Sequence, residues 1–425
     1  MTKIEMISTV FLSIALLHSF ITPLFSKWSH HFEKDSALEV LFHLLSEVEI
    51  VFGFWAFVFM AVWASLEGFQ PVIDYQQSLH MAEPLFVFCI MILSSTRPIV
   101  TLARQALMWI SSILEKITQI SKIHLQLFVI LSVGALLGSF ITEPAAMTIL
   151  ALLLYRMFNK EQMDYKLLYA IVAVLFVNIS VGGGLTHFAA PPILIVAGKF
   201  NWSLKDVFFN LGPAVITIVF VNALGLCLFF KKSIQQSLLP IENDTYPIPK
   251  WIFITHVIFL ALIVYTSHYE KVFMGLFLIF MGLTSVTKKF QDGLKLRESF
   301  LVAFFLAGLI VFGGLQKWWL TPLLSSMKET WLYFAATGLT AITDNAALTF
   351  LGSQVPLTET SKWALVSGAI TGGGLTILAN APNPAGFSIL STLFPGQTLN
   401  ASRLFLSALM PTVVAILSFL LFGSF

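Results

Sequence analysis

The sequence predicts an all-α polytopic membrane protein built from two repeats of inverted topology, with re-entrant hairpins and Gly-broken helices. Three observations lead to this fold class: the composition, two short motifs that recur in the same order, and an uneven division of Lys and Arg between loops. Of the 425 residues, 57% are hydrophobic and 11% are charged. A soluble domain carries about 25% charged residues, so the chain lacks the polar surface of a soluble protein of its size.

Composition and motifs also exclude several function classes. The formal net charge is +2, and no basic stripe is present that could bind a nucleic-acid backbone. Cys89 and Cys227 lie in apolar runs and offer neither a disulfide framework nor metal-ligand spacing. The sequences HExxH, GxSG and Walker A are absent, so an intramembrane protease or an ATP-driven pump would lack its machinery. We therefore predict that the protein is not an enzyme and uses no cofactor.

Apolar segments of about 20 residues predict membrane crossings. The first of them, 4–25, is interpreted as a retained span, because no clear signal-peptide cleavage site follows it. The segment 101–122 differs, because its apolar residues form one helical stripe from Leu102 to Ile120, which predicts a helix lying flat on the membrane. The predicted crossings are 4–25, 47–68, 84–99, 165–200, 207–230, 251–268, 271–287, 298–314, 362–395 and 403–424.

Two motifs indicate an internal duplication. The sequence ITEPAAMT at 141–148 recurs as ITDNAALT at 342–349, an offset of 201 residues. The sequence GGGLT at 182–186 recurs unchanged at 372–376, an offset of 190 residues. Because the order and the spacing agree, we expect two related halves. The predicted division is 1–83 as N-terminal peripheral helices, 84–231 as the first repeat, 232–297 as a linker with two spans, and 298–425 as the second repeat.

The distribution of positive charge predicts that the two repeats are inverted. The arms 331–342 and 346–356 contain 12 and 11 residues, about 16–18 Å of helix, so neither can cross a core of about 30 Å. If both acid-bearing segments are re-entrant, 17 of the 24 Lys and Arg residues fall on one side and 7 on the other. An excess of Lys and Arg marks the cytoplasmic side. Both termini are therefore predicted to face outward, on the periplasmic side.

Two acidic residues are the strongest candidates for a functional site. Only Glu143 and Asp344 lie in the middle of apolar segments, at matched positions of the two halves. A carboxylate at mid-membrane costs at least about 2.5–3.5 kcal/mol, so such a residue indicates a function. The alternative is that each acid only caps a turn, since Asp and Asn accept hydrogen bonds from free amides at helix starts.

Polar residues and glycines surround these acids in the sequence. Three successive glycines allow a helix to unwind, and a broken helix at membrane depth leaves carbonyls and amides that can bind ions. The alternative explanation for the glycines is close helix packing. The predicted Na⁺-binding residues are Glu143, Asp344, Thr142, Thr343, Asn345, Thr186, Thr376, Asn380, Asn383, Asn178 and His187, and the predicted backbone breaks are Gly182, Gly183, Gly184, Gly372, Gly373 and Gly374.

At these motifs the chain resembles the ion transporter superfamily, and in particular a branch of bacterial Na⁺/H⁺ antiporters. The superfamily includes D-type sodium/proton antiporters, membrane subunits of arsenite pumps and divalent-anion/sodium symporters. The resemblance rests on TDN at 343–345, GGGLT at 372–376 and ANAPN at 379–383, and it covers about 84–425. It implies a homodimer with an elevator mechanism, in which hairpins and broken helices form a moving transport domain and the other helices form a scaffold.

The two acids favour a cation as the transported species. The anion symporters of this superfamily carry Ser-Asn-Thr at both tips, whereas here the tips are TEP at 142–144 and TDN at 343–345. Two carboxylates repel a dianion and attract Na⁺ or H⁺. We therefore expect a secondary active transporter, a Na⁺/H⁺ antiporter with Na⁺ bound at Glu143 and Asp344, in the bacterial inner membrane.

Two other functions fit the sequence less well. One is Na⁺- or H⁺-coupled symport of a small organic or inorganic anion, with the same residues binding the coupling ion. The other is a membrane scaffold without transport, which leaves the paired acids unexplained. The expected partners are the lipid bilayer, small ions and a second copy of the chain, and no nucleic acid.

Overall fold

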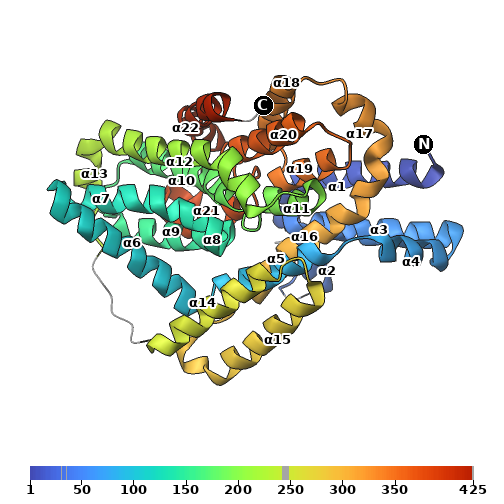
Figure 1. Cartoon of the computed structure of the whole chain (residues 1–425), viewed down its shortest axis with the longest axis horizontal. Coiled ribbons are helices and arrows are strands. Elements are labelled where there is room, and N and C mark those ends of the chain that lie inside the picture. The colour runs from blue at the N-terminus through green and yellow to red at the C-terminus, as the bar shows by residue number, and fades with distance from the viewer. Residues whose placement is uncertain (30, 35, 242–247, 424–425) are drawn as a thin grey trace. The chain divides into compact units, whose positions relative to one another are not determined.

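The structure, a computed structural model, describes residues 1–29, 31–34, 36–241 and 248–423. Within these ranges the regular structure is helical, and one isolated β-bridge joins Phe158 to Leu238. Figure 1 shows the helices in chain order. The predicted all-α class is confirmed.

The chain divides into two compact units. Unit 1 comprises Met1–Cys89, Leu296–Ser326 and Phe350–Pro356, and unit 2 comprises Ile90–Lys295, Met327–Thr349 and Leu357–Phe425. The division into four parts was predicted from the sequence repeats, whereas these two units are defined by contacts in space. The four-part division therefore stays a prediction. All residues predicted to bind ions belong to unit 2.

Unit 1 is a helical bundle around α3. The helix α3 packs against α1 and α16, and the approach to α16 is close because glycines face each other. A Cβ atom on Gly308 would lie 2.5 Å from the backbone nitrogen of Gly53. Small residues allow such contacts between membrane helices. The helices of this unit are α1 (Lys3–Ser29), α2 (Ala37–Leu45), α3 (Val48–Glu67), α4 (Phe69–Ser78), most of α5 (Ala82–Ser94), α16 (Leu296–Gly313), η4 (Gly314–Gln316) and α17 (Lys317–Leu324).

Unit 2 is built around α10 (Tyr165–Gly182). This helix packs against α8, α12 and α22. Nearly all residues of its most apolar stretch are buried inside the protein. The other elements that lie in this unit or begin there are α6 (Arg97–Thr118), α7 (Lys122–Val129), η1 (Ile130–Gly134), α8 (Ala135–Ile141), α9 (Glu143–Met157), η2 (Gly183–Leu185), α11 (Pro191–Phe200), α12 (Leu204–Phe229), α13 (Lys231–Ser237), α14 (Lys250–Tyr265), α15 (Glu270–Val286), η3 (Lys288–Phe290), α18 (Glu329–Thr340), α19 (Asn345–Ser353), α20 (Glu359–Gly372), α21 (Pro382–Leu390), η5 (Ser391–Leu393), η6 (Pro395–Gln397) and α22 (Ala401–Phe422).

Side chains at the helix starts explain where several of these helices begin. The Asp164 carboxylate accepts hydrogen bonds from the amides of Lys166 and Leu167 at the start of α10. Ser203 and Asp206 form a reciprocal capping box at the start of α12. Each cap satisfies amides that have no partner within the helix.

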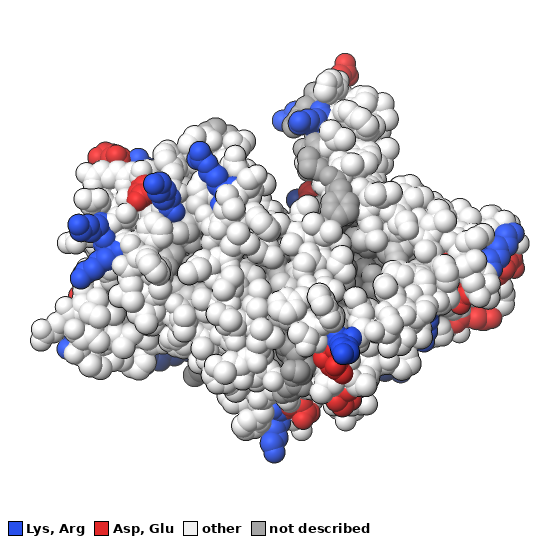
Figure 2. Space-filling model, turned by 90° about the horizontal axis from the view of Figure 1, so that it is seen from above, with Lys and Arg blue, Asp and Glu red and all other residues white. Residues whose placement is uncertain are grey.

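Among the described residues, six helical segments are long and apolar enough to cross a membrane, and the bent pair α4–α5 could add a seventh. The predicted crossings 84–99, 251–268 and 271–287 form the shorter helices α5, α14 and α15, of 13, 16 and 17 residues. In Figure 2 most of the visible surface carries no charged side chain. The six segments are Ile50–Glu67, Lys122–Ile141, Tyr165–Leu185, Leu204–Phe229, Leu296–Leu324 and Ala401–Phe422.

The predicted amphipathic segment 101–122 corresponds to α6. The helix ends at Thr118, because Gln119 adopts a left-handed conformation, so Ile120 lies outside it and the predicted end is wrong by four residues. One face, including Ile99, Ala103 and Leu107, is buried in unit 2. The exposed side of α6 carries the large apolar residues Leu102, Trp109 and Ile117 together with the polar residues Gln105 and Lys116.

Helices α8 and α9 form a hairpin about Thr142, side by side in Figure 1. A Cβ atom on Gly138 would lie 3.5 Å from Cβ of Ala146, and one on Gly134 would lie 2.5 Å from Cδ2 of Leu150. Both pairs are equidistant from Thr142 along the chain, as an antiparallel hairpin requires. A hairpin is therefore present at the first acid. Its first arm belongs to the segment Lys122–Ile141, which is long enough to cross a membrane, so the re-entrant character of this hairpin stays a prediction. The second segment is interrupted between α18 and α19, over residues 341–344.

Candidate functional site

Two helix breaks lie at the predicted glycine clusters. The helix α10 ends at Gly182 and the chain resumes as α11 at Pro191, while α20 ends at Gly372 and the chain resumes as α21 at Pro382. Proline suits the first turn of a helix, because its missing N–H has no intrahelical partner there. Pro191 and Pro382 therefore mark the positions where an α-helix begins again after each break.

The two halves repeat the same local contacts at these breaks. Thr186 Oγ1 donates a 2.6 Å hydrogen bond to the Ser139 carbonyl oxygen, and Thr376 Oγ1 donates a 2.9 Å hydrogen bond to the Ala341 carbonyl oxygen. A Cβ atom on Gly182 would lie 2.7 Å from the Ala135 carbonyl oxygen, and one on Gly372 would meet the Thr337 carbonyl oxygen. In both comparisons the residue at the second break lies 190 residues after its counterpart at the first break. The residue that it contacts lies 202 residues after its own counterpart. This agreement supports the duplication, and the inverted orientation stays a prediction.

The glycines act through their small size. The only glycine with a positive φ in the described part of the chain is Gly68, so the glycines of the two clusters do not use the left-handed conformation that glycine allows. A Cβ atom on Gly183 would meet Glu143 Oε1, and one on Gly373 would meet Ser180 Oγ. Close packing was the alternative explanation for the glycine clusters. It places the Glu143 side chain against the backbone at Gly183 and the Ser180 side chain against the backbone at Gly373.

Glu143 begins α9 and is completely buried. Its Oε2 atom accepts a 2.9 Å hydrogen bond from Asn380 Nδ2, and its Oε1 atom has no hydrogen-bond partner. Of the acidic side chains that the structure describes, Glu143 is the only buried one, and no described Lys or Arg is buried. A buried carboxylate is unfavourable unless it is neutralised or paired with a positive charge, and none of the described basic side chains is buried with Glu143.

Three asparagines provide further oxygen atoms around the same breaks. The side-chain oxygens of Asn345, Asn380 and Asn383 are buried and have no hydrogen-bond donor. Asn383 Nδ2 donates to the carbonyl oxygens of Gly373 (2.8 Å) and Thr376 (2.9 Å), and Asn345 Nδ2 would be 3.0 Å from a Cβ atom on Gly373. We call Glu143 Oε1 and these three amide oxygens the four unpaired oxygens. One carboxylate with neutral oxygens is a donor set that suits a hard cation such as Na⁺.

Asp344 differs from Glu143, although the sequence pairs them. Its Oδ1 atom accepts hydrogen bonds from the amides of Ala346 (2.8 Å) and Ala347 (3.1 Å), so it caps the start of α19, and it is only half-buried. Asp344 nevertheless lies near enough to Glu143 to interact with it electrostatically. The capping role, which the sequence left as an alternative, therefore applies to Asp344.

The family model that matches this sequence covers residues 3–422 and is described as "Putative Na+/H+ antiporter". The chain belongs to this family. The resemblance found in the sequence is thereby confirmed, and the family together with the apolar helices identifies a multi-pass membrane protein of the antiporter type. No curated protein matches the chain.

The tip threonines of this antiporter-family member have different surroundings. Thr142 has a φ of 74°, which is strained for a β-branched residue and is found mainly at functional positions. Its Oγ1 lies 3.5 Å from Ser94 Oγ. Thr343 Oγ1 instead donates a 2.9 Å hydrogen bond to the Leu339 carbonyl oxygen in the preceding turn.

The structure does not place Asn178 and His187 among the four unpaired oxygens. Asn178 Nδ2 donates to the carbonyl oxygens of Leu131 (2.9 Å) and Val219 (3.0 Å), and Asn178 Oδ1 accepts a 2.9 Å hydrogen bond from Asn222. Asn178 thus holds α10 against its neighbours. The His187 ring stacks on the His268 ring, with 6.1 Å between the centroids, in the stretch before α11.

Sequence reasoning missed three hydroxyl groups at the breaks. Ser139 Oγ donates to the Gly182 carbonyl oxygen (2.7 Å), and Ser180 Oγ donates to the Ile370 carbonyl oxygen (2.7 Å). Thr340 Oγ1 is buried without a partner. The repeat contained a signal for two of them, since Ser139 and Thr340 are also 201 residues apart. Across the described residues, no group of three or more His, Cys, Asp or Glu side chains could hold a metal ion.

Proposed function

We propose that this protein exchanges Na⁺ for H⁺, and that Glu143 binds the two cations alternately. The observation that carries the proposal is the burial of the Glu143 carboxyl group with one oxygen unpaired and no cationic side chain beside it. Either a proton or Na⁺ can neutralise this group. Because burial disfavours an uncompensated charge, one cation leaves only when the other arrives, which is the requirement for coupled exchange.

The three asparagines distinguish the two bound states. When Na⁺ is bound, the oxygens of Asn345, Asn380 and Asn383 supply neutral ligands that replace water around the ion. When a proton is bound, Asn380 still donates its hydrogen bond to Oε2, so the carboxyl group remains fixed. Thr142, Thr186, Thr343 and Thr376 complete the proposed surroundings, and Asp344 contributes negative potential rather than a second equivalent ligand.

The remaining features of the proposal rest on the resemblance and on the charge distribution. They are an elevator movement of the hairpins and broken helices, a homodimeric scaffold, and insertion in a bacterial inner membrane with both termini outside. Cysteine pairs that cross-link the homodimer in membranes, and accessibility labelling of loop residues, test these features independently of ion exchange.

The test is exchange by purified protein in proteoliposomes that contain a pH-sensitive dye. Addition of Na⁺ outside should move protons in wild type, and Glu143→Gln should abolish this response. Asp344→Asn should weaken exchange without abolishing it, because Asn also caps helix starts. Glu161→Gln, at an exposed loop position, is the matched control and should leave exchange unchanged.

Three results would contradict the proposal. Full exchange by Glu143→Gln would remove this carboxyl group from the mechanism. Na⁺-dependent uptake of labelled succinate or citrate, without proton movement, would establish anion symport instead. Absence of any ion movement by folded wild-type protein, in dye and solid-supported-membrane current measurements, would support a scaffold.

A further inference from the structure

An aromatic stack joins the two broken helices. Trp202 comes two residues after the end of α11, and Trp363 lies on α20. The centroids of the two indole rings are 3.6 Å apart and the ring planes differ by 3°, and the two residues are only 5% and 6% exposed. Because α11 belongs to the first predicted repeat and α20 to the second, this contact links the two halves inside unit 2.

The backbone on both sides of Trp202 is fixed. Asn201 ends α11 in a left-handed conformation with a φ of 55°, and the Trp202 amide donates a 2.9 Å hydrogen bond to the Ala197 carbonyl oxygen. The capping box of Ser203 and Asp206 begins α12 at the next residue. Trp202 therefore has a defined position at the end of α11, and a side chain that stacks on it is held relative to that helix.

Contact between ring faces, and not hydrogen bonding, holds the stack together. Trp202 Nε1 is buried without a hydrogen-bond partner, which is unfavourable for an N–H donor, so the large apolar area of the rings has to outweigh this cost. A neighbouring contact connects the same helices, since Lys362 Nζ of α20 lies 5.2 Å from the centroid of the Phe200 ring. Both contacts fasten the C-terminal end of α11 to the N-terminal part of α20.

The two helices lead from this stack to the two breaks. Gly372, the last residue of α20, lies nine residues after Trp363, and Pro191, the first residue of α11, lies nine residues before Phe200. At 1.5 Å per residue each arm is about 13–14 Å long. The stack is therefore remote from the ions and can act on their site only through the two helices.

The arms also meet at the breaks. A Cβ atom on Gly184 would lie 3.6 Å from Ile370 Cδ1 of α20 and 3.7 Å from Ile193 Cδ1 of α11. Ser180 Oγ, one turn before the first break, donates a 2.7 Å hydrogen bond to the Ile370 carbonyl oxygen. Contacts at both ends therefore set the position of α11 relative to α20.

The Glu143 carboxyl group depends on this alignment, because it contacts both breaks. A Cβ atom on Gly183, in the first break, would meet Glu143 Oε1, and Asn380, in the second break, donates a 2.9 Å hydrogen bond to Glu143 Oε2. A hydrogen bond is lost beyond about 3.5 Å, so a relative shift of the two breaks by about 0.6 Å is enough to break this one.

We propose that Trp202 and Trp363 are positioning residues for ion exchange, and that their stack holds α11 against α20 so that Asn380 meets Glu143. This inference rests on the proposed function, because it assigns the pair a role in the Na⁺ affinity of the same site. Neither ring is an ion ligand. The stack acts on exchange through the hydrogen bond between Glu143 and Asn380.

The experiment is a Na⁺ titration of dye-loaded proteoliposomes that contain Trp363→Leu, Asn380→Ala or both substitutions. Trp363→Leu should raise the half-saturating Na⁺ concentration about tenfold, as expected for Asn380→Ala, because both variants lose the same hydrogen bond. The double variant should show the same shift as each single variant, whereas independent effects would multiply to about 100-fold. Trp202→Leu should behave like Trp363→Leu. Trp363→Phe keeps a ring in the stack and should restore a titration close to wild type.

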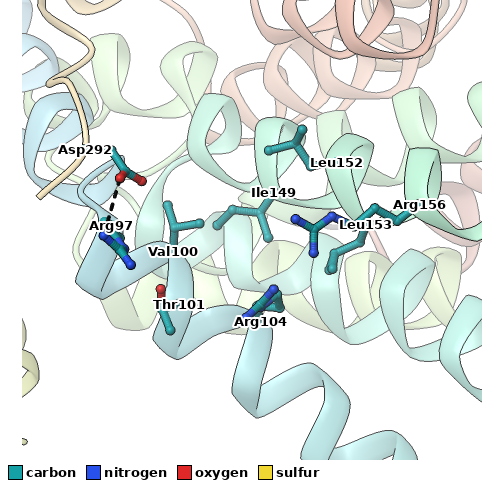
Figure 3. Close-up of a pocket in the computed structure, with 9 residues that line it drawn as sticks. All are labelled: Arg97, Val100, Thr101, Arg104, Ile149, Leu152, Leu153, Arg156 and Asp292. Carbon is teal, nitrogen blue, oxygen red and sulfur yellow. Dashed lines mark ion pairs between the residues drawn. The ribbon is translucent and has the colours of Figure 1, made fainter. Parts of the chain in front are cut away.

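Two controls separate positioning from general destabilisation. Phe280→Leu removes another completely buried ring, 5.5 Å from the Phe259 ring, between α14 and α15, where no predicted ion-binding residue lies. It should lower the melting temperature and leave the Na⁺ titration unchanged. Val100→Ala alters the wall of a pocket of about 340 Å³ that residues of α6 and α9 line together with Asp292 (Figure 3), and it should also leave the titration unchanged.

Several results would overturn the proposal. An unchanged half-saturating Na⁺ concentration in folded Trp363→Leu and Trp202→Leu would remove the stack from ion binding. Multiplied shifts in the double variant, or an equal shift in Phe280→Leu, would make the stack an ordinary packing contact. In these cases wild type still exchanges ions, whereas absence of exchange by wild type would refute the proposed function and this role with it. If the leucine variants do not fold, Trp202→Met and Trp363→Met keep more of the volume without a ring, and the same comparisons decide.

Discussion

A single added methyl group at Gly183 should displace the Glu143 carboxyl group. In Gly183→Ala the new Cβ atom would meet Glu143 Oε1, would lie 2.7 Å from Glu143 Cγ, and would lie 3.0 Å from Ala190 Cβ. Carbon atoms in contact are about 3.5 Å or more apart, so the Glu143 side chain has to retreat by about 1 Å. The 2.9 Å hydrogen bond from Asn380 would then be broken, because it would exceed about 3.5 Å.

The expected loss follows from that hydrogen bond. A hydrogen bond to a charged group contributes about 1.5–3 kcal/mol, which corresponds to a change of about 10- to 100-fold in the Na⁺ concentration for half-maximal exchange. The measurement is a Na⁺ titration of dye-loaded proteoliposomes, with thermal melting as a check on folding. Overpacking should lower stability by about 1–3 kcal/mol, and the melting curve should remain cooperative.

Gly225→Ala is the matched control, because nothing lies within 4 Å of a Cβ atom at that position of α12. It should exchange like wild type and melt at the same or a higher temperature, since Ala is favoured over Gly inside a helix. The reasoning is refuted if Gly183→Ala keeps the wild-type half-saturating Na⁺ concentration. It is also refuted if Gly225→Ala is impaired to the same degree.

Three further variants test other contacts. Asn380→Ala should raise the half-saturating Na⁺ concentration about tenfold or more, and an unchanged titration would separate Asn380 from ion binding. Asn178→Leu should lower the melting temperature, because it removes three buried hydrogen bonds, those that Asn178 donates to the Leu131 and Val219 carbonyl oxygens and the one that it accepts from Asn222. The protein that folds should keep the wild-type Na⁺ titration. Burial opposes ionisation of Asp164, but the hydrogen bond from Ser233 and two backbone amides outweigh it and hold its pKa below the ordinary 3.8. Its cap therefore stabilises the fold above that pH, and Asp164→Ala should melt earlier at pH 7 by an amount that decreases as the pH falls below 3.8.

The sequence was sufficient to predict the parts of this fold that depend on composition and repetition. The all-α class follows from long apolar segments, and the two breaks follow from a motif that is repeated without change at Gly182 and Gly372. The prolines at 191 and 382 also explain where the helices restart. The span predicted at 271–287 matches α15 in length and is displaced by one residue, whereas the span predicted at 251–268 is longer than α14, which ends at Tyr265 before the polar residues Thr266, Ser267 and His268.

The site could be predicted only in part, because spacing along the chain does not reveal which polar groups satisfy one another. Asn178 and Asn380 look alike in an apolar segment, yet Asn178 uses its amide to hold neighbouring helices, whereas Asn380 reaches Glu143 in the other half. Glu143 and Asp344 align in the sequence, but only Asp344 caps the following helix, since its shorter side chain can bend back to the amides of Ala346 and Ala347.

The burial of a single acidic side chain has an electrical consequence. Na⁺ and H⁺ each carry one positive charge. Glu143 is the only buried acid among the residues that the structure describes, so under the proposed function its surroundings would have the same net charge with either ion bound. Moving one elementary charge through 100 mV changes the free energy by about 2.3 kcal/mol. If Glu143 carries Na⁺ in one direction and H⁺ in the other, as proposed, the two movements transfer the same charge through this voltage, and the cycle would be electroneutral. The concentration gradients of the two ions, and not the membrane potential, would then set the direction of exchange.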